Sequence, residues 1–464
     1  MRKVGLFGLI AIVIGSMLGG GIFNLPGEMA QNAVAGASII AWLITGIGVF
    51  FIAKVFQVLS FERGDITSGI YYYAKEGFGN YIGFNSAWGY WLSNAIGNVS
   101  FAILFVDALT KFFPAIKGSN GLIGTIISTI LIWAVVLLVA KGMKTATAFN
   151  NIATIAKIVP IIIAIFLLFV SFKMHIFTKN LWVTNITMDG LTLGSISSQI
   201  KDAMLQTLWV FVGVEGAVVI SGRAKNSRDV GIATIIGYVF VLICYVLIVE
   251  LSYGSVPQEN LMAFKDPSLA GVLKYTYGNW ADILIDIGVI ISVLGAWVSW
   301  TILTAEIPLA VAEDKMFPKF LAKVNKENAA IAALIFNAAI MQITYFFAMF
   351  ANNAFEAITN VATEMVLIPY VLSALFLVKI SYEDKKWRNF IYGICGTIYS
   401  LFMIFTSGLM NLLECTSLYA LGIIFLIITT HEQGSKMFNH KWEKYFCYVL
   451  TIVGIAAIFI MKFK

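Results

Sequence analysis

Apolar stretches of membrane-spanning length alternate with short polar loops along the whole chain. A helix needs about 20 consecutive apolar residues to cross the hydrocarbon core of a bilayer, and each stretch reaches roughly that length. The pattern predicts an all-α, polytopic membrane protein and leaves open whether twelve or thirteen helices span the bilayer. The predicted helices cover approximately residues 4–30, 34–59, 81–112, 123–140, 151–172, 198–221, 231–253, 280–312, 329–350, 355–378, 390–410, 414–430 and 445–462.

Two of the predicted helices are interrupted close to their middle. In the first, residues 14–23 read Ile-Gly-Ser-Met-Leu-Gly-Gly-Gly-Ile-Phe, and in the sixth, residues 211–216 read Phe-Val-Gly-Val-Glu-Gly. Each glycine weakens a helix by roughly 1 kcal/mol relative to alanine, and backbone that unwinds within a membrane is tolerated where it lines a cavity inside the protein. A close crossing of two helices through small residues is the alternative for the first stretch.

The two interrupted helices lie five positions apart in the order of helices. Broken helices at matching positions of two halves are typical of transporters with inverted repeats, whose binding site lies near the bilayer midplane. We therefore predict a transporter core over residues 1–380, with helices one to five and six to ten as two five-helix inverted repeats. Residues 381–464 are predicted to add two or three C-terminal transmembrane helices, and a homodimer through these helices is left open.

Composition and charge agree with a location in the membrane. Of the 464 residues, 59% are hydrophobic and 12% are charged, about half the charged fraction typical of soluble domains. The net charge of +6 arises mainly in alternate loops, which the positive-inside rule assigns to the cytoplasm. We expect a multi-pass plasma-membrane protein with a cytoplasmic N-terminus, in contact with the lipid bilayer and without a nucleic-acid partner. The basic loops include residues 63–75, 141–144, 223–228, 315–326, 379–388 and 436–444.

The sequence carries no pattern for a metal, a cofactor or catalysis. Its four Cys and three His lack the spacing of metal ligands, and it contains no hydrolase, metalloprotease or phosphate-binding motif. We therefore expect no metal, no cofactor and no enzyme activity. A channel is disfavoured, because only the third predicted helix carries a polar stripe, which includes Tyr90, Asn94 and Asn98.

The interrupted helices offer a chemistry suited to a zwitterion. Where a helix unwinds, free N–H groups and free carbonyl groups carry the partial charges of the helix dipole. An amino acid has a carboxylate and an ammonium on one carbon, so it can bind both without buried charged side chains. The expected carboxylate ligands are the amides of Gly19, Gly20 and Gly21, and the expected ammonium ligands are the carbonyls of Met17, Trp209 and Val212.

The interrupted stretches also carry a family resemblance. Residues 19–26, Gly-Gly-Gly-Ile-Phe-Asn-Leu-Pro, resemble the first-helix motif of the amino acid, polyamine and organocation transporter superfamily, and residues 209–216, Trp-Val-Phe-Val-Gly-Val-Glu-Gly, are similar to its sixth-helix motif. Residues 156–160 and the overall layout most resemble the basic amino acid antiporters, especially the arginine/ornithine exchangers. The resemblance implies the LeuT-type fold. Further matches lie at residues 90–98, at Trp300 followed by residues 316–318, and at residues 368–370.

The resemblance also implies roles for single residues. Trp209 would cap the substrate from outside, Tyr90 would form part of the outer gate, and Trp300 would be a middle gate. Asn98 and Phe101 would contact the substrate side chain, and Asn94 lies on the same polar stripe. The family often has serine where this chain has Gly20, so backbone amides must bind more of the carboxylate here.

Of the charged residues within predicted helices, where charge is functional by default, three are candidates for a role in transport. Glu215 follows the sixth-helix interruption, and the resemblance ties it to gating or proton coupling; the alternative is a carboxylate satisfied by backbone amides. We expect Glu364 to bind the cationic end of the substrate, unless it forms a salt bridge with Lys157 or another protein group. For Lys157, the resemblance implies bracing of the first and eighth helices, and proton exchange is the alternative.

Together these features predict an amino acid transporter that works by alternating access. The leading hypothesis is an antiporter that exchanges a cationic amino acid such as arginine for ornithine. Two alternatives stay open: a proton-coupled amino acid symporter, and an exchanger of an amino acid for its decarboxylated amine, such as arginine for agmatine.

Overall fold

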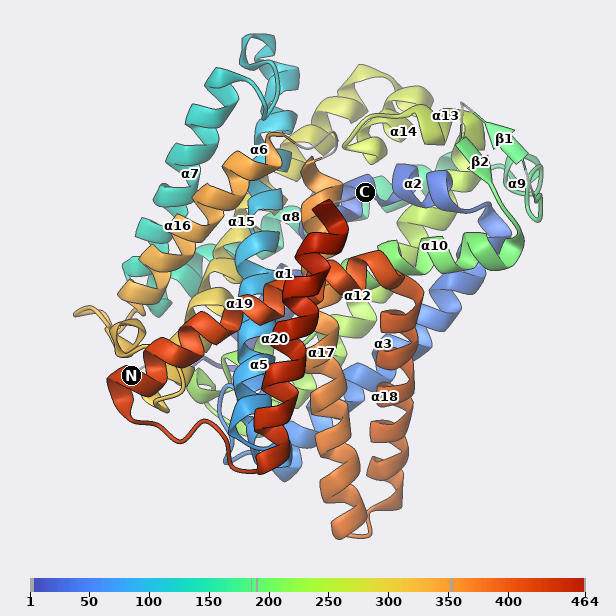
Figure 1. Cartoon of the computed structure of the whole chain (residues 1–464). Coiled ribbons are helices and arrows are strands. Elements are labelled where there is room, and N and C mark those ends of the chain that lie inside the picture. Colours follow the sequence, from blue (N-terminus) through green and yellow to red (C-terminus); the bar gives the residue numbers. More distant parts are fainter. Residues whose placement is uncertain (1–3, 185, 189–190, 351–353, 463–464) are drawn as a thin grey trace.

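The computed structural model describes residues 4–184, 186–188, 191–350 and 354–462, and these form a helical bundle with one short β-hairpin (Figure 1). A membrane-embedded backbone must satisfy its hydrogen bonds internally, and helices do this within each segment. In order, the elements are α1 (Leu6–Met17), α2 (Gly21–Asn32), α3 (Ala35–Glu62), α4 (Gly69–Phe78), α5 (Asn80–Gly97), α6 (Val99–Phe112), η1 (Pro114–Ile116), α7 (Leu122–Ala140), α8 (Met143–Ser171), α9 (Met174–Phe177), β1 (Ile186–Met188), β2 (Leu191–Leu193), α10 (Ile196–Trp209), α11 (Gly216–Val219), η2 (Ser221–Arg223), α12 (Ser227–Ser255), α13 (Gln258–Ala263), α14 (Ser268–Tyr277), α15 (Asn279–Glu313), η3 (Lys319–Ala322), α16 (Ile331–Ala348), α17 (Ala354–Glu383), α18 (Trp387–Ser407), α19 (Leu409–Gln433) and α20 (Lys441–Lys462).

Twelve helices of the described chain are long and apolar enough to cross a membrane, counting α1 with α2 and α5 with α6 as single spans. This confirms a polytopic, all-α membrane protein. The pair α10 and α11 is not among the twelve, because six residues interrupt it between Trp209 and Gly216. With this interrupted pair the order of helices matches the thirteen predicted from the sequence.

The long helices end at two faces of the bundle. We call the one that carries Val4 the N-terminal face and the other the opposite face. At the N-terminal face, Val4 pairs with the backbone of Arg223, the Arg223 guanidinium binds Glu306 through two hydrogen bonds of 2.6 and 2.9 Å, and Lys75 binds Asp314. The opposite face carries η1, the β1–β2 hairpin and α13, and it is where α12 ends and α15 begins.

The two interrupted helices lie inside a scaffold of long helices. α12 packs on both α1 and α3, α8 packs on α15, and α5 packs on α17. α1 contacts α8, α12, α15 and the short α11, and α11 also contacts α12 and α15, so these two long helices adjoin both interrupted helices. This arrangement places the unwound backbone where lipid does not reach it.

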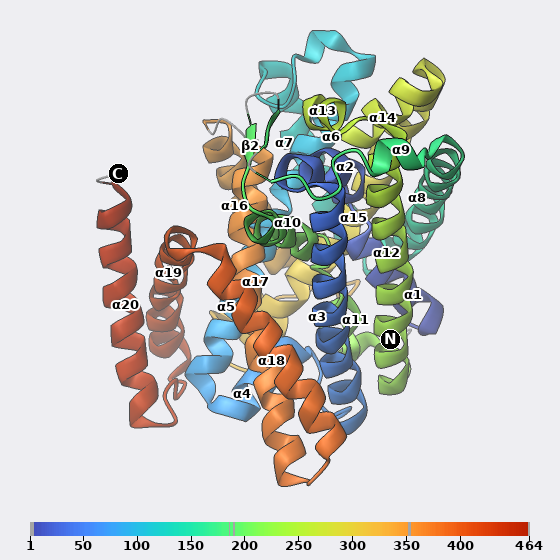
Figure 2. The same ribbon diagram turned by 90° about the vertical axis from the view of Figure 1, so that its right-hand side faces the viewer.

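The last helices lie at the edge of the bundle. α18 packs on α17 and α3, whereas α19 and α20 pack mainly on each other, with α20 outermost (Figure 2). α19 and α20 therefore lie outside the bundle that encloses the interrupted helices. The division into a core over residues 1–380 and a C-terminal part over residues 381–464 stays a prediction, as do the inverted repeats.

Several predicted boundaries are wrong by a few residues. The fifth predicted helix begins at Met143 and not near residue 151, because the polar residues between them continue the helix. Residues 69–78, between the second and third predicted helices, form the short helix α4, in which Tyr71 and Tyr73 are buried.

Candidate functional site

The interruption between α1 and α2 is held open by side chains from two other helices. Lys157 Nζ, on α8, donates to the main-chain oxygens of Gly15 at 2.9 Å and Leu18 at 2.8 Å. Ser292 Oγ, on α15, donates to the oxygens of Leu18 at 3.1 Å and Gly19 at 3.0 Å. The carbonyls that leave α1 are therefore satisfied. The Gly19 amide donates to the Met17 oxygen at 2.7 Å, whereas the amides of Gly20 and Gly21 have no acceptor among the described residues.

The interruption between α10 and α11 depends on a glycine with a left-handed backbone. Gly213 has φ +112°, a conformation that side chains rarely adopt. A Cβ at this position would also lie 2.8 Å from both Cβ and Oγ of Ser16 and 3.0 Å from Cζ2 of Trp300. Ser16 Oγ donates to the Gly213 oxygen at 3.0 Å, so this tight approach joins α1 to the second interruption.

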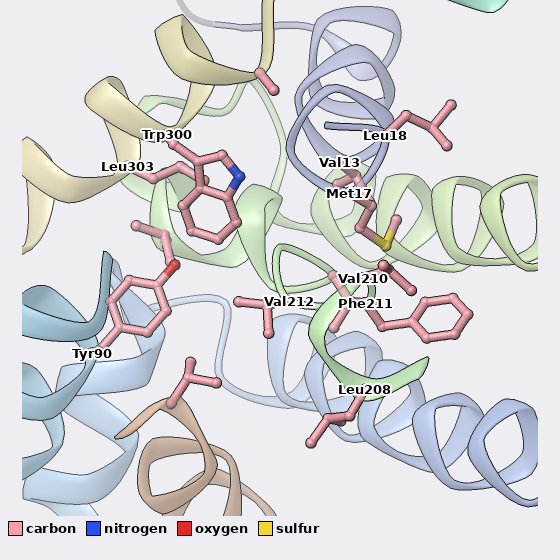
Figure 3. Close-up of a cluster of buried hydrophobic side chains, with 14 of the residues drawn as sticks. Val13, Met17, Leu18, Tyr90, Leu208, Val210, Phe211, Val212, Trp300 and Leu303 are labelled. Carbon is pink, nitrogen blue, oxygen red and sulfur yellow. The ribbon is translucent and has the colours of Figure 1, made fainter. Parts of the chain in front are cut away.

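Two aromatic side chains connect the interruptions further. The Tyr245 hydroxyl, on α12, lies 2.6 Å from the Met17 oxygen and 2.8 Å from the Val210 oxygen, one carbonyl from each interruption. Trp300 Nε1, on α15, donates to the Ser16 oxygen at 2.9 Å. Figure 3 shows Met17, Val210, Val212 and Trp300 gathered where the two unwound segments meet.

A cavity of about 40 Å³ lies between these segments and α5, α6 and α17. It brings together ten of the predicted substrate-binding residues, from six different helices and the two unwound segments. Its further lining residues are mostly small or apolar, and Ser16, Ser93 and Ser100 add hydroxyl groups. The predicted residues that line it are Met17, Gly19, Gly20, Gly21, Asn94, Asn98, Phe101, Trp209, Val212 and Trp300.

Neutral polar groups and aromatic rings provide the chemistry of this cavity. Among the described residues that line it, none is charged. Asn98 Nδ2 donates to Thr304 Oγ1 at 3.2 Å, whereas Asn94 Nδ2 is buried and has no hydrogen-bond partner within the described part of the chain. A ligand acceptor at Asn94 would satisfy this donor, since a buried unsatisfied group costs about 1–3 kcal/mol.

Trp209 lies on the side of the cavity that points to the opposite face. Its ring approaches Gly21 on α2 and Gly97 on α5, where added Cβ atoms would lie 3.9 Å from Nε1 and 3.5 Å from Cη2. The indole thus reaches across the cavity from the end of α10, and its role as a cap stays a prediction.

Glu215 lies under the cavity, toward the N-terminal face, and is fully buried. Its carboxylate accepts hydrogen bonds from the Tyr90 hydroxyl at 2.8 Å, from the Gly213 amide at 3.1 Å and from the Tyr370 hydroxyl. The carboxylate is therefore satisfied by two tyrosine hydroxyls and one backbone amide, and the predicted role of Glu215 in gating or proton coupling stays a prediction.

The position of Tyr90 changes one expectation. Tyr90 precedes Asn94 by one helical turn on α5, which runs from the N-terminal face toward the cavity. If the N-terminal face is cytoplasmic, as its basic loops predict, Tyr90 lies on the inner side of the cavity, and its expected place in an outer gate is not supported.

Glu364 does not line the central cavity. Ala362, two residues earlier on α17, lines it, and two residues of a helix turn by about 200°, so Glu364 faces the other side. There Glu364, with Leu367 and Tyr419, borders a separate cavity of about 180 Å³. Cys415 Sγ donates a hydrogen bond to Glu364 Oε2 at 3.4 Å. The expected contact with the cationic end of the substrate is not supported, and neither is the alternative salt bridge with Lys157.

Three residues of the site were missed from the sequence. Tyr245 and Ser292 are polar residues within apolar helices, and this was a signal that could have identified them. Tyr370 was noted only as part of a motif, and its bond to Glu215 depends on how α17 packs against α5 and the second interruption. No group of three or more potential metal ligands gathers within the residues that the structure describes.

The family model described as amino acid permease matches residues 4–412, which include both interruptions and every residue of the cavity. The chain belongs to the amino acid permease family. This confirms the superfamily that the first and sixth helices resemble, and the chain is a multi-pass membrane transporter.

Close relatives of this permease cover nearly its whole length. It is 42% identical to the arginine/agmatine antiporter of Chlamydia caviae over 99% of this chain and 97% of that protein. It is also 42% identical to the arginine/agmatine antiporter of Chlamydia pneumoniae, over 98% of this chain and 96% of that protein. A putative amino-acid transporter of Clostridium perfringens is 39% identical over 100% and 99% of the two chains.

Proposed function

We propose that this permease exchanges arginine for agmatine across the membrane by alternating access. The observation that carries this proposal is the uncharged cavity between two interrupted helices, walled by Phe101, Trp209 and Trp300. The names of the two chlamydial relatives support agmatine as the exchanged product.

Arginine and agmatine share two cationic groups that the cavity is suited to bind. Both carry an ammonium group, which the partial negative charge of carbonyls at the interruptions would bind. Both carry a guanidinium group, which stacks favourably on aromatic rings without a carboxylate partner. Arginine alone carries a carboxylate, which the N–H groups at the start of α2 would bind.

Ornithine, the exchange partner first favoured from the sequence, has a different cationic group. Its side-chain ammonium is strongly hydrated and does not stack as a guanidinium does. A wall of aromatic rings without an acidic side chain therefore favours guanidinium substrates, and we place agmatine ahead of ornithine.

A competition experiment in purified proteoliposomes tests this ranking. Uptake of labelled arginine is measured against an excess of unlabelled arginine, agmatine, ornithine, lysine or alanine outside. The proposal expects agmatine to compete within a few-fold of arginine and well ahead of ornithine. If ornithine competes as well as arginine while agmatine does not compete, the proposed pair is wrong and the arginine/ornithine pair replaces it.

We propose further that the N-terminal face is cytoplasmic and that the protein functions in the plasma membrane without an enzymatic step. The charge pattern of the loops supports this orientation. Labelling of single cysteines at Lys326 and Lys179 with a membrane-impermeant reagent in intact cells tests it. The proposed orientation expects labelling at position 179 only, and labelling at position 326 alone would reverse it.

Two buried groups have proposed roles in the transport cycle. Lys157 braces the first interruption, since it joins α8 to two carbonyls of α1 and its neighbouring turn. Glu215 links α5, α17 and the second interruption through Tyr90 and Tyr370, so we assign it to an inner gate that separates when the cavity opens to the cytoplasm. A homodimer through α18, α19 and α20 stays a proposal as well.

A further inference from the structure

A groove of about 240 Å³ runs between α3 and α12 on the outside of the bundle, away from the substrate cavity. One wall carries Ile39, Leu43 and Ile47, which recur every four residues along α3. Leu43 and Ile47 are 59% and 60% exposed, so this side of the groove is open to lipid. The groove is lined by Ile39, Trp42, Leu43, Gly46, Ile47, Leu242, Val246 and Glu250.

A carboxylate with an unused oxygen lies at one end of this apolar groove. Ser38 Oγ donates to Glu250 Oε1 at 2.6 Å. Glu250 Oε2 is buried and has no hydrogen-bond partner among the residues that the structure describes. The Trp42 indole N–H, one turn along α3 from Ser38, is also buried and without an acceptor in the described chain.

The polar end of the groove lies at the boundary between the lipid head groups and the hydrocarbon core. α12 has 29 residues and is about 43 Å long, whereas the hydrocarbon core is about 30 Å thick, so each end of the helix projects by about 6 Å. Glu250 is five residues before the end of α12 at Ser255, about 7 Å inward. Ser38 is similarly close to the start of α3, which begins at Ala35.

The groove therefore follows the order of groups in a phospholipid, with a polar end and an apolar length. A carboxylate oxygen at the head-group boundary suits an ammonium donor. The apolar side chains beyond it, Leu43, Ile47, Leu242 and Val246, suit an acyl chain.

We propose that this groove binds a phospholipid with a primary-amine head group, of the phosphatidylethanolamine class, from the leaflet at the opposite face. Charge complementarity at Glu250 decides the occupant. A primary ammonium donates hydrogen bonds to the carboxylate, whereas the quaternary ammonium of phosphatidylcholine has no N–H and phosphatidylglycerol has no cation. The site is independent of the exchange of arginine for agmatine.

Native mass spectrometry of the purified protein tests this site. The protein is incubated with equal amounts of phosphatidylethanolamine, phosphatidylcholine and phosphatidylglycerol of matched acyl chains, and bound lipids are compared. The wild-type protein is expected to retain phosphatidylethanolamine preferentially. Glu250→Gln keeps the side-chain shape and is expected to lower this preference about tenfold, the loss expected for one charge-assisted hydrogen bond.

Two further variants keep the result decisive. Glu259→Gln removes the same charge from an exposed position on the same face, outside the groove, and is expected to leave the preference unchanged. Val246→Trp fills the groove and is expected to remove the bound lipid, while size-exclusion chromatography reports whether the variant is folded. Equal retention of the three lipids by the wild-type protein overturns the proposal, and so does an unchanged preference in Glu250→Gln. Disulfide formation between two copies of Leu43→Cys also overturns it, because it would assign the groove to a second copy of the chain.

Discussion

Trp300 Nε1 donates a hydrogen bond of 2.9 Å to the main-chain oxygen of Ser16, one residue before the end of α1. Ser16 in turn donates from its hydroxyl to Gly213, so this pair joins the two interruptions that enclose the cavity. The side chain of Trp300 lines the cavity while its N–H holds the backbone of α1, and we propose on this double contact that Trp300 acts as a middle gate.

Trp300→Phe is expected to lower arginine transport about tenfold, because it leaves a buried carbonyl at the interruption with one donor fewer, a change of about 1–3 kcal/mol. Trp297→Phe is the matched control. It makes the same change one turn earlier on α15, where the indole N–H has no acceptor among the described residues. Equal losses of transport in the two variants would show that ring size, and not the bond to Ser16, matters.

Gly213→Ala is expected to lower thermal stability in detergent and to abolish transport. The substitution adds a Cβ to a left-handed residue and places it against Ser16 and Trp300. Gly278→Ala separates the two effects, since Gly278 has φ +85° but no atom within 4 Å of the added Cβ. Backbone strain alone amounts to about 1–2 kcal/mol, so Gly278→Ala is expected to shift the melting temperature less and to retain transport. A fully active Gly213→Ala protein would contradict the described packing.

Lys157→Met is expected to reduce arginine affinity and thermal stability at every pH. The ammonium holds two carbonyls at the first interruption, and methionine has a similar length but no donor. Because bracing does not require proton release, the residual uptake should keep the shape of the wild-type pH profile. A flattened profile in Lys157→Met would instead support proton exchange by this residue.

Glu364→Gln is expected to leave the preference for arginine over alanine unchanged, within about twofold. Its carboxylate borders a different cavity from the one that holds the predicted substrate contacts. Phe101→Ala, which removes an aromatic wall of the central cavity, is expected to lower that preference about fivefold or more, the size of a cation–π contact. A tenfold loss of selectivity in Glu364→Gln would restore the role that the sequence suggested.

The parts of the site made by local sequence could be predicted from the sequence. Runs of glycine weaken a helix wherever they occur, so the unwound segments at residues 18–20 and 210–215 follow from the residues themselves. The residues that line the cavity beside them, such as Asn94 and Asn98, follow from helical spacing.

Contacts that depend on the packing of distant helices could not be predicted in the same way. A carboxylate within a membrane helix indicates a buried polar environment, but the sequence does not show which helix packs against it. Glu364 lies against Cys415 on α19 and not against the substrate cavity. The hydroxyl of Tyr245 reaches both interruptions only because α12 packs on α1 beside the turn after α10. Such contacts can be identified only when the three-dimensional arrangement of the helices is known.

The most direct test of the proposed exchange is uptake of labelled arginine into proteoliposomes that contain agmatine, compared with identical proteoliposomes that contain no amino acid or amine. An obligate exchanger binds its substrate in both orientations and needs an internal substrate to return. We predict rapid uptake into agmatine-loaded vesicles and uptake near background into empty ones. Equal uptake into loaded and empty vesicles would contradict exchange, and stimulation by ornithine but not by agmatine would contradict the proposed pair.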